Sequence, residues 1–78
     1  EWEGPIRLLF IDGSHDFASV AADFQAWCGH VAPGGFIAMH DYGHSPDVVK
    51  FCDEVVKPMP EYPVYALANS LMVFQYAP

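Results

Sequence analysis

The order in which apolar segments change their period is the feature that most restricts the fold of this chain. Residues 6–11 form a short, almost continuous apolar run. From Phe17 onward the apolar residues recur every three or four positions, and a second continuous run occupies residues 36–39. Short continuous runs are typical of buried strands, whereas a period of three to four is typical of an amphipathic helix. The pattern therefore predicts two strands with a helix between them.

Residues that favour caps and turns predict where these elements end. Ser14 or Asp16 can cap the first helix, and Gly29 suits a left-handed turn just past its last residue. The Pro-Gly-Gly sequence at residues 33–35 predicts a tight turn before the second strand. Ser45, followed by a proline, predicts the N-cap of a second helix.

The last third of the chain predicts a β-hairpin. Residues 64–68 and 71–76 are rich in strand-forming residues and are separated by the turn formers Asn69 and Ser70. The complete order is βαβαββ, which implies right-handed parallel crossovers for the first three strands. We therefore expect an α/β fold with parallel strands, whose continuous apolar runs suit strands covered on both faces, and with an antiparallel C-terminal hairpin strand.

Length and apolar content together predict that residues 1–78 are part of a longer protein. A chain of 78 residues is short for an enzyme domain, yet 53% of its residues are hydrophobic. Small domains bury only about 60% of the surface that their unfolded chains expose, so this apolar content exceeds what one small core uses. The chain also begins at Glu1 without an initiator Met. We expect one half of a domain, with a missing partner surface or a homodimer contact.

Charge and composition argue against several classes of partner. The net charge of −7 repels a phosphate backbone, so nucleic acid is an unfavourable partner. No apolar run approaches the roughly 20 residues that span a bilayer, and we expect no membrane partner. Cys28 and Cys52 lack the spacing of a disulfide framework or a metal site and are expected to be buried thiols. These features predict a cytoplasmic protein.

Polar residues gather directly after the two predicted buried strands. In open α/β sheets, ligands bind outside the carboxyl ends of the parallel strands, where side chains from several loops converge. Ser14 and Asp16 are explained as helix caps. The remaining polar residues follow the strands directly and are candidates for function: Asp12, His15, His40, Asp41, Tyr42 and His44.

The segments at residues 10–17 (FIDGSHDF) and 31–42 (VAPGGFIAMHDY) resemble the region from the fourth to the fifth strand of class I S-adenosylmethionine-dependent methyltransferases. In that family the fourth strand often ends in Asp, and a Gly-Gly turn introduces the fifth. The hairpin at residues 64–76 is similar to the family's sixth and seventh strands. The resemblance covers essentially the whole chain and implies the C-terminal half of a Rossmann-like domain with S-adenosylmethionine as cofactor.

Within that family the pattern looks most like the small metal-assisted O-methyltransferases and their sugar-modifying relatives. The resemblance implies Asp12, His40 and Asp41 as metal ligands, and Asp12 and Gly13 as cofactor contacts. Mg²⁺ is the preferred ion for oxygen ligands, but the imidazole of His40 departs from the family's pattern and favours Zn²⁺, Mn²⁺ or Fe²⁺. His15 stands where catechol-type members have a Lys, so it is the implied catalytic base.

The acceptor of the methyl group is expected to be a small molecule or a sugar, and Tyr42, Tyr62 and Tyr65 can line its pocket. The Gly-rich loop and acidic residue that hold the cofactor in this family have no counterpart in the chain. We therefore expect the isolated 78 residues to bind S-adenosylmethionine weakly and to be inactive.

Two other interpretations remain open at this point. The first is a non-catalytic partial domain that associates through an exposed sheet edge or through helix faces. The second is a metal-dependent hydrolase that uses the strand-end residues Asp12, His15, His40, Asp41 and His44.

Overall fold

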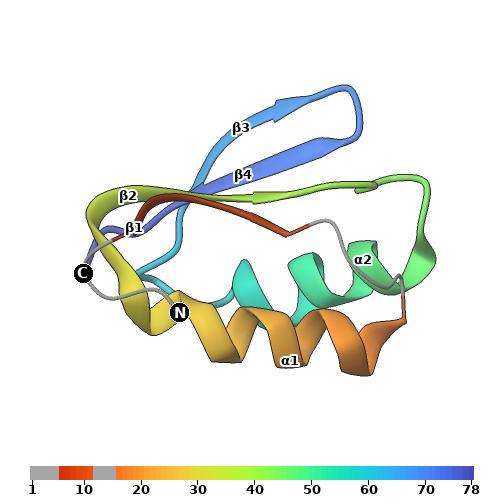
Figure 1. Cartoon of the computed structure of the whole chain (residues 1–78). Coiled ribbons are helices and arrows are strands. Elements are labelled where there is room, and N and C mark those ends of the chain that lie inside the picture. Colours follow the sequence, from red (N-terminus) through yellow and green to blue (C-terminus); the bar gives the residue numbers. More distant parts are fainter. Residues whose placement is uncertain (1–5, 12–15) are drawn as a thin grey trace.

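The computed structural model describes residues 6–11 and 16–78, which form a small α/β structure. None of the helices in this part of the chain is long and apolar enough to cross a membrane. A short 3-10 turn, Cys28–His30, follows the first helix, and a π-helical segment, Cys52–Val56, continues the second. The main elements are β1 (Ile6–Ile11), α1 (Phe17–Trp27), β2 (Val31–Met39), α2 (Pro46–Phe51), β3 (Val64–Ala68) and β4 (Leu71–Gln75) (Figure 1).

The four strands form one mixed sheet in the order β1-β2-β4-β3. β1 pairs with β2 in parallel, whereas β4 is antiparallel to both of its neighbours, β2 and β3. The mixed sheet and its antiparallel last strand are therefore confirmed. The last strand of the chain lies inside the sheet, between β2 and β3, which the sequence pattern did not predict.

Both helices pack against the same face of the sheet (Figure 1). Alternate strand residues point toward them, because successive side chains of a strand face opposite sides. Ile37, Met39 and Phe74 are almost completely buried there, together with Phe24 and Phe51 from the helices. The rings of Phe24 and Phe51 meet edge to face, with centroids 5.3 Å apart. One apolar core between the sheet and the two helices thus holds the described elements together.

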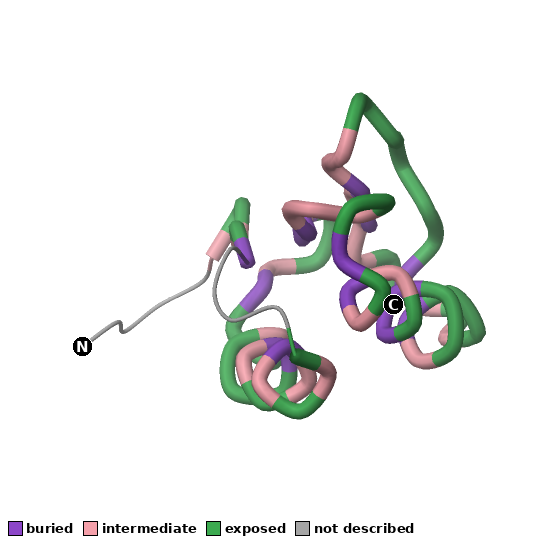
Figure 2. Tube along the Cα trace, turned by 90° about the vertical axis from the view of Figure 1, so that its right-hand side faces the viewer, coloured by how far each residue is buried: buried purple, intermediate pink, exposed green. Residues whose placement is uncertain are grey.

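The apolar run of β1 suited a strand covered on both faces, but among the described residues one of its faces is uncovered. Leu8 and Phe10 alternate with the buried side chains of β1 and are 62% and 52% exposed. Phe36 of β2 lies on the same side, where its ring contacts that of Tyr65 at 4.7 Å between centroids. We call Leu8, Phe10, Phe36 and Tyr65 the open sheet face. β3 is also exposed along its whole length, whereas β4 alternates between intermediate and buried residues (Figure 2).

The first helix begins as predicted but ends differently. Asp16 is its N-cap, and its carboxylate accepts hydrogen bonds from the Ser19 backbone N–H at 2.8 Å and the Ser19 hydroxyl at 2.9 Å. The other cap candidate, Ser14, lies outside the described residues. The predicted left-handed turn at Gly29 is wrong, because the chain tightens into the 3-10 turn there. Val31, whose spacing fitted the helix, belongs to β2.

The predicted Pro-Gly-Gly turn is an irregularity inside β2, not a boundary before it. Ile6 pairs with Val31 and Leu8 pairs with Phe36, so two steps along β1 correspond to five along β2. Gly34 supplies the left-handed conformation that this irregularity needs, with φ of 85°. At Gly35 the chain passes so close to itself that a Cβ atom would lie 2.9 Å from the carbonyl oxygen of Ala32.

The second helix follows the sequence prediction more closely. Ser45 occupies the N-cap position and Pro46 the first turn. Val48 and Phe51 of α2 face the core, and the π-helical segment leaves Cys52 and Val56 with no exposed surface.

Substituting alanine at two glycines tests the close approach at Gly35. We expect Gly35→Ala to lower the free energy of unfolding by about 1–3 kcal/mol, because the new methyl group overlaps the backbone. Gly29→Ala is the matched control, since nothing lies within 4 Å of its Cβ position and its φ is not left-handed. It should be neutral or stabilise by less than about 1 kcal/mol. Urea denaturation measures both, and equal effects would contradict the packing at Gly35.

The buried thiol of Cys52 predicts a loss of stability at alkaline pH. Burial raises its pKa from 9.0 to about 12. The folded state thus favours the protonated thiol more strongly than the unfolded state does. The contribution of the thiol to the free energy of unfolding is complete below about pH 9 and is lost as the pH rises toward 12. Between about pH 8 and pH 11 we expect Cys52→Ala to lose about 2–3 kcal/mol less unfolding free energy than the parent chain. Urea denaturation at each pH measures both proteins, and equal losses of unfolding free energy in Cys52→Ala and the parent chain would refute this prediction. The pH dependence of stability that remains in Cys52→Ala is expected from Tyr62, because burial also raises the pKa of its hydroxyl to about 12.

Candidate functional site

The carboxyl ends of the parallel strands β1 and β2 lie side by side. Ile11, the last residue of β1, pairs with Met39, the last residue of β2. The backbone N–H of His40 then donates to the carbonyl of Ile11 at 3.1 Å. The polar sequences that follow β1 and β2 therefore begin at neighbouring points. Three predicted site residues that follow β1 in sequence, Asp12, Gly13 and His15, lie outside the described residues.

His40 and Asp41 form a close pair at the end of β2. The Nδ1 atom of His40 lies 3.2 Å from Oδ1 of Asp41, and the side chains are 40% and 21% exposed. The imidazole ring is also near the exposed ring of Phe10, with centroids 5.8 Å apart. The structure thus brings together the two described members of the predicted metal set, at an edge that solvent reaches.

The backbone of Asp41 is left-handed, with φ of 66°. Asp tolerates this region better than most residues, but the conformation still costs about 1 kcal/mol relative to an extended or helical one. The carbonyl of Asp41 accepts hydrogen bonds from the N–H groups of His44 and Ser45, both at 3.0 Å. Gly43, with φ of 96°, completes the tight loop of residues 40–45.

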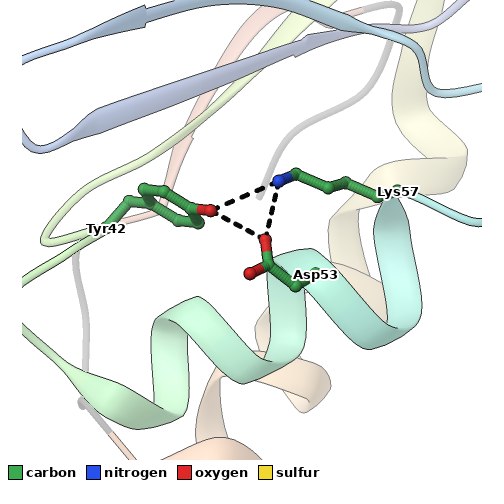
Figure 3. A network of polar contacts seen from close by, with 3 residues as sticks. All are labelled: Tyr42, Asp53 and Lys57. Atoms are coloured by element: carbon green, nitrogen blue, oxygen red, sulfur yellow. Dashed lines mark hydrogen bonds and ion pairs between the residues drawn. The ribbon is translucent and has the colours of Figure 1, made fainter.

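Tyr42 ties this loop to two other parts of the fold. Its backbone N–H donates to the carbonyl of Ser70, in the β3–β4 turn, at 2.8 Å. Its hydroxyl donates to Asp53 at 2.7 Å and accepts from Lys57 at 3.3 Å, while Lys57 and Asp53 form an ion pair at 2.9 Å (Figure 3). We call Tyr42, Asp53 and Lys57 the tyrosine network.

The polar contacts of this network shift the pKa values of all three side chains. The hydrogen bond to Asp53 raises the pKa of Tyr42, since it favours the protonated phenol. Hydrogen bonds from Lys57 and then Tyr42 lower the pKa of Asp53, and the contact with Asp53 raises that of Lys57. Both members of the ion pair are substantially exposed, so its contribution to stability is at most about 1 kcal/mol.

Asp47 connects the starts of the two helices close to this loop. Its Oδ2 atom accepts a hydrogen bond from the backbone N–H of Phe17 at 3.0 Å. A carboxylate of α2 thereby satisfies a free donor in the first turn of α1. The two helices begin beside each other at the end of the sheet where β1 and β2 end (Figure 1).

The remaining sequence candidates are dispersed. His44 lies exposed in the loop of residues 40–45. Tyr62 is a core residue that stacks on Tyr76, with ring centroids 5.3 Å apart, and Tyr65 belongs to the open sheet face. Of the three tyrosines that were candidates to line an acceptor pocket, only Tyr42 therefore lies next to the His40–Asp41 pair, and Tyr62 serves in packing.

The described residues show no formed metal centre at the strand ends. Residues 6–11 and 16–78 contain no group of three or more His, Cys, Asp or Glu side chains placed to bind a metal ion. A hollow of about 290 Å³ exists elsewhere, at the amino ends of β1 and β2, lined by Arg7 and residues 32–36. It contains none of the predicted site residues.

Comparison with known proteins gives this arrangement a family. The sequence model of a family described as a methyltransferase domain matches residues 1–42, which is more than half of the chain. The chain belongs to this methyltransferase-domain family. The matched segment contains both strand ends and runs through His40, Asp41 and Tyr42. The resemblance to methyltransferases expected from the sequence is therefore confirmed at the level of the domain.

A viral protein is also similar to the chain. It is an uncharacterized protein of Acanthamoeba polyphaga mimivirus, 37% identical over 54 residues that make up 65% of this chain and 24% of the viral one. The matched segment thus spans about a quarter of that relative's length.

The tyrosine network was missed in the sequence. Asp53 and Lys57 have the spacing of an ion pair on one helix face, which is a visible but common signal. The hydroxyl that joins them comes from Tyr42, 11 residues before Asp53, and only the folded loop brings it there.

Proposed function

We propose that this chain is the C-terminal half of a class I, S-adenosylmethionine-dependent methyltransferase that acts on a hydroxyl group of a small molecule or sugar. The observation that carries the proposal is the family match over residues 1–42, which includes both polar strand ends. The antiparallel β4 beside parallel β2 also agrees with the methyltransferase sheet that the sequence resembles.

Asp12 and Gly13 are the residues proposed to contact the cofactor, which supplies an electrophilic methyl group when it is bound. The described neighbourhood fits such a ligand, because β1 ends at an open edge. Phe10, two residues before Asp12, is half exposed and offers an apolar surface next to His40.

Asp12, His40 and Asp41 are proposed to hold a divalent cation, with Mg²⁺ preferred unless the imidazole shifts the choice. Two donors that share one cation at about 2.1 Å lie about 3.0–3.4 Å apart. The 3.2 Å between Nδ1 of His40 and Oδ1 of Asp41 fits this spacing. Such an ion would lower the pKa of a bound hydroxyl and orient it.

His15 is proposed to take the proton from the acceptor hydroxyl. Methyl transfer from a sulfonium is an in-line displacement, so the work of the protein is to orient the acceptor oxygen and to remove its proton. An imidazole with an ordinary pKa near 6.5 is suited to that role at neutral pH. The side chains at the end of β2 would then help to orient the acceptor.

The test uses the full-length protein, labelled S-adenosylmethionine and a panel of hydroxylated small molecules and sugars. We expect His15→Ala to lower turnover by about 10²–10⁴-fold and to remove a limb of the pH profile near neutrality. His30→Ala is the matched control, since His30 lies in the 3-10 turn after α1, away from the strand ends. Failure to bind the cofactor or to transfer methyl to any acceptor would refute the proposal, and an unchanged pH profile in His15→Ala would refute the role of His15.

A second candidate function, non-catalytic association with another copy, is favoured by one observation. The open sheet face exposes Leu8, Phe10 and Tyr65, and β1 is one of the two edge strands of the described sheet. An apolar face beside a free edge is a typical association surface. The alternative location, the helix faces, has one large exposed apolar side chain among the described residues, Trp27.

Light scattering over a wide range of concentrations distinguishes these surfaces. If copies associate through the sheet, the double substitution Leu8→Ser with Phe10→Ser should raise the dissociation constant by at least about tenfold. Trp27→Ser, which removes an exposed aromatic from α1, should leave it unchanged. A monomer at all concentrations, or a stronger effect of Trp27→Ser, would contradict association through the sheet face.

A further inference from the structure

The geometry of the His40–Asp41 pair depends on a backbone conformation that needs support. Asp41 adopts φ of 66°, and residues in sparsely populated conformations persist only where the surrounding structure fixes them. The two hydrogen bonds to its carbonyl come from His44 and Ser45, within the same loop. The next residue, Tyr42, links this backbone to parts of the fold outside the loop.

Tyr42 provides two anchors outside the loop, directly after Asp41. Its N–H is bound to Ser70 in the hairpin turn, and its hydroxyl is bound to the π-helical segment and the residue that follows it. The Lys57 ammonium also lies over the Tyr42 ring, 5.5 Å from its centroid. In Figure 3 the phenol points away from the loop toward Asp53 and Lys57, which approach it from one helical surface. These contacts fix Tyr42 at both its backbone and its side chain.

The π-helical segment explains why Asp53 and Lys57 are available for this contact. Cys52 and Val56 within it are completely buried, which holds the segment against the core. Asp53 and Lys57 each follow one of these buried residues and face solvent beside Tyr42. Short π-helical stretches inside helices are frequent near functional sites.

We propose that the tyrosine network of Tyr42, Asp53 and Lys57 positions the His40–Asp41 pair by holding Asp41 in its left-handed conformation. The three are positioning residues that act through the backbone of the loop. Their structural role stands on the contacts alone, whereas its consequence for turnover rests on the proposed methyl transfer.

Nuclear magnetic resonance on the full-length protein tests the positioning role without any substrate. Tyr42→Phe removes the hydroxyl and keeps the ring, and Lys57→Met removes the ammonium and keeps most of the stem. We expect each to lower the hydrogen-exchange protection of the Tyr42 and Ser45 amides by about three- to tenfold, as for the loss of one modest hydrogen bond. The imidazole ¹⁵N shifts of His40 should move in both variants, because they report its contact with Asp41.

Glu54→Gln is the matched control, since Glu54 is exposed on the same segment and its loss changes the charge by the same amount as Asp53→Asn. It should leave the loop amides and His40 unchanged, whereas Asp53→Asn should reproduce the effect of Lys57→Met. The amide of Gln75, bound to Pro63 in a distant part of the sheet, should keep its protection in every variant. Non-additive effects in the double variant Tyr42→Phe with Lys57→Met would support a single network.

Two results would overturn the positioning role. One is unchanged His40 shifts and loop protection in both Tyr42→Phe and Lys57→Met. The other is an equal loss of protection at Gln75, which would show general destabilisation. The same variants in the turnover assay separate the two proposals. Altered His40 shifts in a protein that transfers no methyl would support the network and refute methyl transfer. Normal turnover with unaltered His40 shifts would support methyl transfer and refute the positioning role of the network.

Discussion

The parallel pairing of β1 with β2 is the contact on which the other arrangements depend. It joins the two strand ends, from Ile11 and Met39 to the hydrogen bond between His40 and Ile11. It also places α1 and α2 on a common face, where their aromatic side chains complete the core. Because both strands run in the same direction, the polar sequences that follow them emerge at one edge of the sheet. The methyltransferase-domain match covers β1, α1 and β2 and ends at residue 42, before α2 begins.

Much of this fold follows from local sequence signals. Periodicity, cap residues and turn formers together indicated the main elements, and the hairpin strand Val64–Ala68 was predicted to the residue. The errors occur where long-range contacts decide the outcome. β2 starts five residues earlier than its apolar run, because the irregularity at Gly34 and Gly35 lets Val31 pair with Ile6. The uncovered face of β1 was also unpredictable, since an apolar run does not show whether a second layer of helices is present.

The acidic residues near the strand ends also include some whose role follows from local sequence signals and others whose role depends on long-range packing. Asp16 is the helix cap that its position suggested. Asp47 was expected only as a favourable charge in the first turn of its own helix, but it also binds the first N–H of the other helix. That role depends on how two elements pack, and no spacing in the sequence encodes it. The His40–Asp41 pair was identified as adjacent polar residues, whereas its support by Tyr42 required the folded loop.

The position of β4 has a consequence for how this chain acquires its structure during synthesis. β3 is made before β4, yet its only neighbour in the described sheet is β4, which inserts between β3 and β2. Until Leu71–Gln75 has left the ribosome, β3 has no partner and the hairpin turn that holds Tyr42 through Ser70 does not exist. A nascent chain or stop mutant that ends at residue 70 would therefore lack the β2–β4 and β4–β3 pairings, which join β3 to the rest of the described sheet.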